Sequence, residues 1–387
     1  MAVDRPYDIV LFGATGFTGG LTAEYLAGNA PAETRWAIAG RNQRKLEDLR
    51  ARLGKPDLAL LEADTGDPAS VREVAEAARV VATTVGPFVE YGEPLVAACA
   101  EAGTDYVDIT GEPEFVDRTY VRHHARAVES GARLVHACGF DSTPHDLGAY
   151  VTVKQLPEGV PIRLEGFVRA GGRPSGGTFQ TTVTAFSRVP EITRASRERR
   201  RIEPRPEGRR VRGIRGIPRH EPAVDAWVLP VPTIDPQIIL RSARALERYG
   251  PDFSYGHYFA VRRLPVAAGM VAGMAGMFAL AQLPPTREWL LGRLKSGKGP
   301  TREQREKSWF KVRFVGRADG TRAVTEVAGG DPGYGETSKM LAESALCLAH
   351  DELPSTAGQV TTAIAMGDAL TGRLERAGIR FEVLESG

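Results

Sequence analysis

The feature that most constrains this chain is a glycine-rich turn near its start, within YDIVLFGATGFTGGLTAEYL at residues 7–26. Three glycines, Gly13, Gly16 and Gly19, stand between an apolar run that predicts a buried strand and a segment that predicts a helix. In such a unit the first glycine permits a sharp turn. The second lets the backbone approach a pyrophosphate, and the third lets helix and strand pack closely.

This turn predicts a dinucleotide site, because N–H groups at the start of a helix attract phosphates. The alternative is a glycine turn in a sheet that binds no nucleotide. The cofactor contacts expected from the turn are Gly13, Ala14, Thr15, Gly16, Phe17, Thr18 and Gly19.

The end of the next strand indicates which dinucleotide binds. Chains that bind NAD usually carry an acidic residue about 20 residues past the loop, where it holds the ribose 2′-OH. Here the strand ends in AIAGRN, so Arg41 takes that place and can pair with a 2′-phosphate. The glycine spacing, GxxGxxG, also occurs in NADP-linked families. We therefore expect NADP(H), unless Arg41 is merely solvated.

Further cofactor contacts are expected where the following strands end. Asn42 adjoins Arg41, and Asp64 follows the third strand, where the adenine would lie. Thr84, Gly86 and Pro87 follow the fourth strand and would border the ribose or the nicotinamide.

The first 140 residues alternate short apolar runs with helical patterns. This alternation predicts an α/β fold, a Rossmann-type doubly wound parallel sheet with right-handed crossovers. We expect this NADP-binding domain over residues 1–141, completed by C-terminal helices at 336–387. The expected strands are Ile9–Phe12, Trp36–Ala39, Ala59–Glu62, Val80–Thr83, Tyr106–Ile109 and Arg133–Ala137.

The middle of the chain has a different pattern of apolar and polar residues. Residues 160–185 and 308–329 alternate apolar and polar side chains, which predicts strands, and Asp319-Gly320 predicts a hairpin turn. We expect residues 142–335 to form a second, α+β domain with a mainly antiparallel sheet, for substrate binding or dimerisation.

An uncharged apolar segment at residues 264–286 lies inside this second domain. Its length is that of a membrane-spanning helix, but glycines and terminal prolines shorten its apolar core. Gly269, Gly273 and Gly276 share one helical face, which suits close helix packing. Three alternatives remain open: a buried or dimer-interface helix, a surface for membrane or acyl chain, and a true span.

Composition places the chain among soluble globular proteins. It has 387 residues, a net charge of +2 and 42% hydrophobic residues. Three widely spaced cysteines fit neither a disulfide framework nor a metal site, and no signal peptide precedes Tyr7. We expect a cytoplasmic protein that holds no metal, with possible peripheral contact at a membrane.

An arginine-rich stretch at residues 188–219 carries twelve arginines against four glutamates. Such a stretch is usually a solvated surface. It would also suit an acidic partner, such as an acyl carrier protein, or anionic phospholipid. Nucleic acid is not expected, because the stretch lacks interleaved aromatic residues.

Two motifs resemble those of a known family. TTVGPFVEYGEPLVAACAEAGTDYVDITGE at 83–112 and GFDSTPHDLG at 139–148 are similar to the saccharopine-dehydrogenase-like NADP-binding family, in particular its mycobacterial trans-acting enoyl reductases. The resemblance covers nearly the whole chain. It implies NADP(H) binding and reduction of a carbon–carbon double bond in a lipid-like or polyketide acyl chain on a carrier or synthase.

Two other functions remain open: reduction of a small imine or carbonyl substrate, and lipid-associated NADP binding without turnover. The family commonly has Val or Ile at the position of Thr143 and Ser at that of His145. The resemblance therefore assigns no catalytic role to this loop.

Enoyl reduction also needs a proton donor and stabilisation of an enolate. The candidates are Tyr91, Asp141 and His145. The alternatives are that Tyr91 packs on a helix start and that Asp141 caps the helix beginning near Pro144. Glu112 is a candidate contact to substrate or to the second domain.

Overall fold

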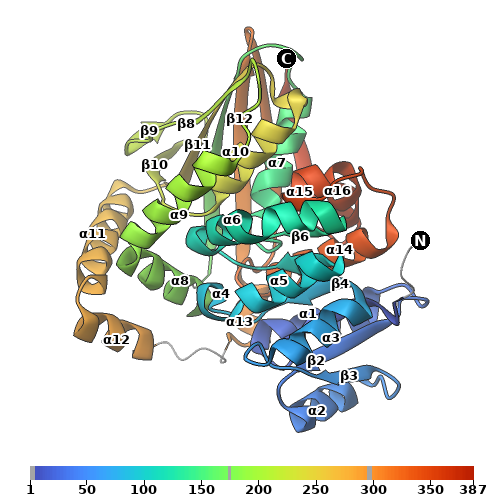
Figure 1. Cartoon of the computed structure of the whole chain (residues 1–387). Coiled ribbons are helices and arrows are strands. Elements are labelled where there is room, and N and C mark those ends of the chain that lie inside the picture. The colour runs from blue at the N-terminus through green and yellow to red at the C-terminus, as the bar shows by residue number, and fades with distance from the viewer. Residues whose placement is uncertain (1–4, 173–175, 294–298) are drawn as a thin grey trace. The chain divides into compact units, whose positions relative to one another are not determined.

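The structure is a computed structural model that describes residues 5–172, 176–293 and 299–387. The chain forms two compact units, which are described separately (Figure 1). The first unit takes in the described residues up to Thr143, together with Ala195–Ile202 and Tyr334–Ala377. The second takes in Pro144–Arg194, Glu203–Gly333 and Gly378–Gly387.

A parallel seven-stranded sheet forms the centre of the first unit. Its strand order is β14-β6-β5-β4-β1-β2-β3, and the six strands β1 to β6 follow the Rossmann arrangement. The predicted doubly wound fold is therefore confirmed, and β14 adds an edge strand from the C-terminal part of the chain. The strands are β1 (Tyr7–Phe12), β2 (Trp36–Gly40), β3 (Ala59–Glu62), β4 (Ala78–Thr83), β5 (Asp105–Asp108), β6 (Arg133–Val135) and β14 (Gly358–Val360).

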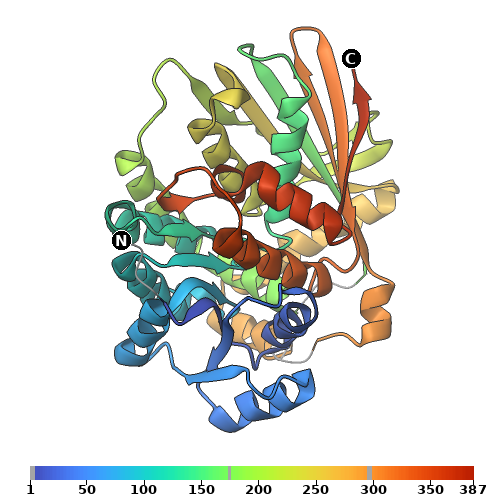
Figure 2. The ribbon, with the colours of Figure 1, turned by 90° about the vertical axis from the view of Figure 1, so that its right-hand side faces the viewer.

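Helices cover both faces of this sheet. Helix α14 packs against α1 and α16 and against strands β1, β4 and β5 (Figure 2), and most of its residues are buried. Helices α3, α5 and α6 form a second contiguous layer. The helices are α1 (Phe17–Asn29), α2 (Gln43–Leu53), α3 (Pro68–Ala77), α4 (Phe88–Tyr91), α5 (Glu93–Ala102), α6 (Pro113–Ser130), α14 (Gly335–His350), α15 (Thr362–Ala365) and α16 (Gly367–Arg376).

A mixed sheet forms the centre of the second unit, in the order β15-β13-β12-β7-β11-β10-β9, with β8 also paired to β11. Most pairs are antiparallel, as predicted, whereas β7–β11 and β8–β11 are parallel. The strands are β7 (Ile162–Gly171), β8 (Arg210–Gly213), β9 (Arg219–Glu221), β10 (Ala226–Pro230), β11 (Asp252–Val261), β12 (Trp309–Ala318), β13 (Thr321–Gly329) and β15 (Arg380–Ser386).

The predicted hairpin joins β12 and β13. Asp319 and Gly320 both have positive φ, 46° and 78°, which is the backbone of a tight turn between antiparallel strands. Helix α7 (Thr143–Lys154) packs on this sheet through Gly148, where an added Cβ would lie 2.3 Å from Phe314 Cε2. Close backbone contact between helix and sheet therefore requires glycine at this position.

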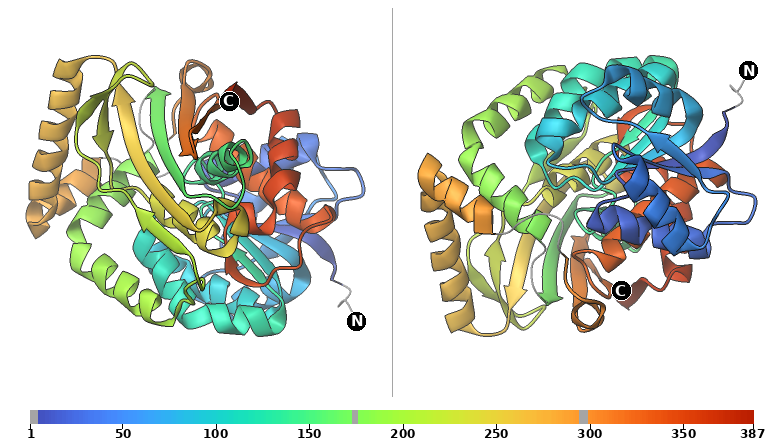
Figure 3. Two further views of the ribbon diagram at one scale, coloured as in Figure 1. Left: turned by 90° about the horizontal axis from the view of Figure 1, so that it is seen from above. Right: turned by 90° about the horizontal axis from the view of Figure 1, so that it is seen from below.

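The other helices of the chain lie mainly in the second unit. Helix α9 begins there, and its residues Ala195–Ile202 belong to the first unit. Helices α11 and α12 contact each other and α8 (Figure 3). The bounds are α8 (Gly176–Ser187), α9 (Val189–Ile202), α10 (Asp235–Ala245), a 3-10 turn at Glu247–Tyr249, α11 (Leu264–Ala281), α12 (Pro284–Arg293) and α13 (Arg302–Glu306).

Two sequence predictions of secondary structure were wrong. The strand expected through residue 185 ends at Gly171, and α8 follows; residues 173–175 of that stretch lie outside the described part. The helical tail expected to the C-terminus gives way to β15, which pairs with β13 in the second sheet. Phe381 and Val383 alternate there with charged residues, which is a strand pattern.

Candidate functional site

The predicted cofactor residues meet at the carboxyl edge of the parallel sheet, where β1 lies between β2 and β4. This is the point at which the strand order reverses, the usual ligand position in such sheets. The loop after β4 lies against the glycine turn: the N–H of Thr84 donates to Phe12 O at 3.1 Å, and its hydroxyl donates to Gly13 O at 3.2 Å. The two predicted loops therefore form one site.

The three glycines of the turn have different surroundings. Gly13 has φ +84°, and a Cβ there would lie 2.5 Å from Val85 Cγ2. A Cβ on Gly19 would lie 2.3 Å from Gly13 O, so α1 packs directly on the turn. Gly16 has φ −75°, and a Cβ there would come no closer than 3.4 Å to the chain. Of these three positions, packing within the chain requires glycine only at Gly13 and Gly19.

Glycine at position 16 is explained by an approaching ligand instead. Gly16 is exposed at the N-cap of α1, and among the described residues no side chain caps this helix. The first turn of α1 carries no acidic residue. An uncapped N-terminus with an exposed glycine fits the pyrophosphate of a dinucleotide.

The other residues of the turn differ in their exposure and in their contacts. Thr15 is exposed beside the turn, whereas the Ala14 side chain is fully buried and can offer a ligand only its backbone. The Phe17 ring packs edge-on against Tyr334, with centroids 4.8 Å apart. Thr18 O accepts a hydrogen bond from Ser338 Oγ at 3.2 Å.

Arg41, Asn42 and Asp64 follow the carboxyl ends of β2 and β3. The Arg41 side chain is exposed there, in the position expected for contact with a 2′-phosphate. Asn42 caps α2, because its side chain accepts the N–H of Lys45 at 2.9 Å. The Asp64 carboxylate accepts the N–H of Gly66 at 2.8 Å and so holds a local turn.

Glu112 fixes the loop that contains Gly86 and Pro87. Its carboxylate accepts the N–H of Phe88 at 2.9 Å and that of Val89 at 2.7 Å, at the start of α4. Burial raises the pKa of Glu112, although these two hydrogen bonds act in the opposite direction. Glu112 therefore has a structural role within the first unit, in holding the start of α4.

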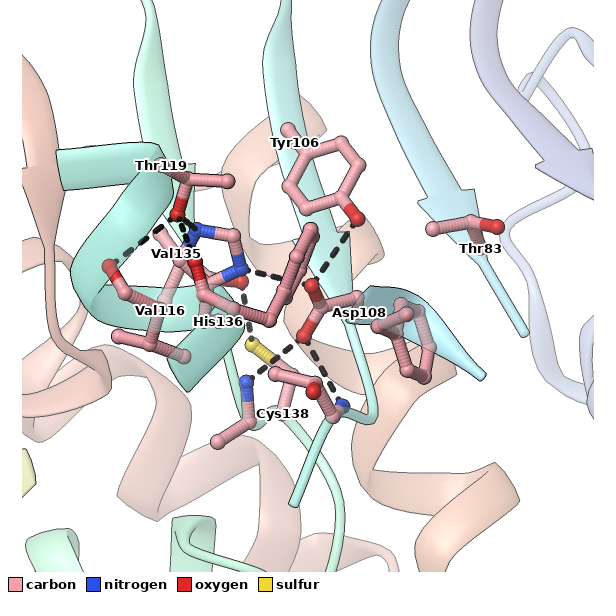
Figure 4. A network of polar contacts seen from close by, with 12 residues as sticks. Thr83, Tyr106, Asp108, Val116, Thr119, Val135, His136 and Cys138 are labelled. Carbon is pink, nitrogen blue, oxygen red and sulfur yellow. Dashed lines mark hydrogen bonds and ion pairs between the residues drawn. The ribbon is translucent and has the colours of Figure 1, made fainter. Parts of the chain in front are cut away.

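A buried polar network at the ends of β5 and β6 was missed by sequence reasoning (Figure 4). The Asp108 carboxylate accepts the hydroxyl of Tyr106 at 2.9 Å and the N–H groups of Thr110 and Ala137 at 3.1 and 2.9 Å. His136 Nδ1 lies 2.7 Å from Asp108 Oδ2, the oxygen that also accepts the Tyr106 hydroxyl. The sequence did carry a signal for this network, because each of the two apolar strands ends in a polar residue: Asp108 in YVD and His136 in LVH.

The network continues from His136 to helix α6 and strand β14. Thr119 Oγ1 lies 3.2 Å from His136 Nε2 and 3.1 Å from Gln359 Oε1, and Gln359 Nε2 donates to Val116 O at 2.9 Å. Asp108 is fully buried and His136 nearly so. The network therefore fixes the carboxyl ends of two strands that border the cofactor edge of the sheet.

The three candidate proton donors do not all belong to one unit. Tyr91 ends α4 in the first unit, and its side chain is 45% exposed. Asp141 is partly buried in the loop that leads to α7. His145 lies on α7 in the second unit and is only 1% exposed.

His145 belongs to a buried cluster of three ionisable side chains in the second unit. Its Nδ1 lies 3.1 Å from Asp235 Oδ1, and His257 Nε2 lies 3.4 Å from Asp235 Oδ2. The hydroxyl of Tyr255 lies 2.8 Å from His257 Nδ1. Burial lowers the pKa of His257 to about 4, although Asp235 opposes the shift. His257 is therefore neutral at pH 7.

The same cluster has a donor set that suits a metal ion, although no metal was expected from the sequence. His145, Asp235 and His257 each offer one ligand atom, and these atoms lie within 4.8 Å of one another. Two imidazoles and one carboxylate fit Zn²⁺ or a similar ion. The same contacts also form a self-consistent polar network without a metal, with Asp235 between the two imidazoles.

A comparison with known protein families defines the general class of this protein. Residues 9–135 match the family described as saccharopine dehydrogenase NADP binding domain. The uncapped α1 and the exposed Arg41 fit that cofactor, so the chain is an NADP-dependent oxidoreductase with a Rossmann domain.

The particular family follows from longer matches. A Mycobacterium tuberculosis protein named provisionally as a trans-acting enoyl reductase is 38% identical over 415 residues, covering 98% of each chain. The trans-acting enoyl reductase of Mycobacterium ulcerans is 34% identical over 413 residues, covering 98% of each chain. The chain belongs to this family of trans-acting enoyl reductases.

A solved structure supports the fold. Saccharopine dehydrogenase from Saccharomyces cerevisiae superimposes with a TM-score of 0.55 at 12% identity, covering 98% of this chain and 100% of that one. At this identity the likeness establishes the shared fold alone.

Proposed function

We propose that this protein is an NADPH-dependent enoyl reductase that acts in trans on a lipid-like or polyketide acyl chain held as a thioester by a carrier protein or synthase. The observation that carries the proposal is the exposed Gly16 at the uncapped start of α1, in a chain related over its whole length to trans-acting enoyl reductases. The cofactor contacts follow from this geometry.

When bound, NADPH supplies the hydride that is added to the β-carbon of the enoyl thioester. In this proposal the start of α1 binds the pyrophosphate and Arg41 binds the 2′-phosphate. Glu112 holds the loop with Gly86 and Pro87, so that this loop borders the nicotinamide in a fixed position. Asp108 and His136 stiffen the neighbouring strand ends.

The α-carbon must then receive a proton, and we assign Tyr91 as the donor. Its phenol is half exposed, directly after the loop that Glu112 holds. Asp141 is the second candidate. His145 is buried against Asp235 and His257, and its role is to support the second unit without touching substrate.

An acidic carrier protein is the partner that fits the arginine-rich stretch. Some of its arginines serve the fold: Arg199 pairs with Asp117 at 2.5 Å, and Arg219 pairs with Glu165 at 2.9 Å. Others are exposed on α9 and available to a partner. These are Arg194, Arg197, Arg200 and Arg201. A cytoplasmic setting is consistent with three cysteines that are free and buried.

The test is transfer of deuterium from NADPH labelled at the transferable position to a long 2-enoyl pantetheine thioester. Mass spectrometry of the acyl product should show one deuterium, and Tyr91→Phe should lower the rate while NADPH binding is retained. Bound NADPH without incorporation would refute enoyl reduction. It would favour an imine or carbonyl substrate, or a cofactor held without turnover.

A further inference from the structure

Helix α11 presents an extended apolar surface to solvent. It is long and apolar enough to cross a membrane by length and composition, yet only 11% of it is buried. Large apolar side chains along it are between 40% and 51% exposed. They are Leu264, Val266, Val271, Phe278 and Leu280. Exposure of this extent marks an interaction site in a soluble domain.

The chain covers only one side of α11. Met274 and Met277 pack on a small cluster formed by Val183, Phe186 and Ala281. On the glycine face, a Cβ added at Gly269, Gly273 or Gly276 would meet nothing within 4 Å. Of the alternatives that the sequence left open, a helix buried within its own chain is therefore excluded.

The path of the chain does not suit a transmembrane span. The 18 residues of α11 extend about 27 Å, close to the thickness of a bilayer core. However, α11 contacts β10 and β11, and α12 returns immediately to contact both α11 and α8. A helix fastened along one side to a folded unit can bury only its free side in lipid.

Positive charge gathers at the N-terminal end of α11. Arg262 and Arg263 are exposed directly before the helix. Arg169 on β7 and Arg313 on β12 lie on neighbouring strands, and Glu326 accepts from Arg313 at 2.7 Å. Burial, followed by the like charges of Arg262 and Arg313, lowers the pKa of Arg169. The local excess of positive charge favours an anionic partner over a second copy of the same helix.

We propose that α11 docks this protein on the surface of an anionic phospholipid bilayer. The exposed side of α11 lies among the acyl chains near the headgroups, and Arg262 and Arg263 contact the phosphates. Apolar burial and attraction to anionic lipid together give reversible peripheral binding. This inference does not depend on the reaction that the protein catalyses.

The experiment is sedimentation of the full chain with vesicles of phosphatidylcholine alone and with added phosphatidylglycerol. Wild type should bind the anionic vesicles more strongly, and high salt should weaken the binding. Val266→Glu with Leu280→Glu should reduce binding at least about tenfold, because both exposed apolar side chains lie on the side of the glycine face and a charge there opposes contact with lipid. Arg262→Glu with Arg263→Glu should remove the preference for anionic lipid.

The matched control is Ile217→Glu, which changes an apolar residue that is even more exposed, elsewhere in the second unit. It should bind vesicles like wild type, and all variants should unfold in urea at the wild-type midpoint, which confirms that the second unit folds. Equal binding by the α11 double variant, or no binding of wild type to any vesicle, would overturn the proposal. So would a stable dimer that the double variant converts to monomer.

Discussion

Glycines are prominent in two regions of this chain, and their surroundings are opposite. In the turn after β1, a Cβ on Gly19 would lie 2.3 Å from the carbonyl oxygen of Gly13. On α11, a Cβ on Gly269, Gly273 or Gly276 would meet nothing within 4 Å. At Gly19 packing within the chain requires glycine, whereas at the three α11 positions it does not. Glycine spacing alone therefore does not distinguish internal packing from a surface left open to a partner.

The largest effect on stability and cofactor binding should come from Gly19→Ala. The added methyl group would collide with backbone that cannot move without displacing the turn, so we expect a loss of about 3 kcal/mol in the free energy of unfolding. NADPH binding should be lost as well. Urea denaturation and fluorescence titration measure the two effects. Wild-type stability in this variant would show that the turn is looser than the structure indicates.

Gly16→Ala should separate stability from cofactor binding. Its backbone suits alanine and there is room for the methyl group, so stability should change by less than about 1 kcal/mol. The affinity for NADPH should fall at least about tenfold, because the methyl group occupies the approach of the pyrophosphate. Titration of NADPH fluorescence measures this. Unchanged affinity would mean that the pyrophosphate does not approach position 16.

Arg41→Glu should have a smaller and more selective effect. The loss of one charge-assisted contact to the 2′-phosphate should reduce the preference for NADPH over NADH by roughly tenfold, since such contacts contribute about 1.5–3 kcal/mol. Stability should not change, because Arg41 is exposed. Lys55→Glu, an exposed charge reversal just after the C-terminal end of α2, is a matched surface control. An unchanged ratio of the two dissociation constants would refute the assignment of Arg41.

Much of the first unit was predictable because its signals are local. The turn, the alternating strands and helices and the position of Arg41 each depend on residues close together in sequence. The Asp108–His136 network was not predictable, because Thr119 and Gln359 reach it from distant segments. The cluster of His145 with Asp235 and His257 depends likewise on tertiary pairing.

In the second unit, periodicity predicted strands but not their ends or partners. The hairpin at Asp319-Gly320 was evident because its turn chemistry is local. The edge strand β15 was missed because its pairing with β13 is a long-range choice. The exposure of α11 was also undecided, because an apolar helix has the same composition whether it is buried or exposed.

The smallest effect on the binding of cofactor and lipid should come from Gly273→Ala on α11, the counterpart of Gly19→Ala in the glycine turn. Nothing lies within 4 Å of the added methyl group, and alanine is a better helix former than glycine. The free energy of unfolding should therefore rise by about 0.5–1 kcal/mol, with NADPH binding unchanged. Binding to anionic vesicles should also persist, because a methyl group adds apolar surface. A loss of stability, or of self-association measured by light scattering, would instead show that the glycine face packs closely against another helix, as in a dimer.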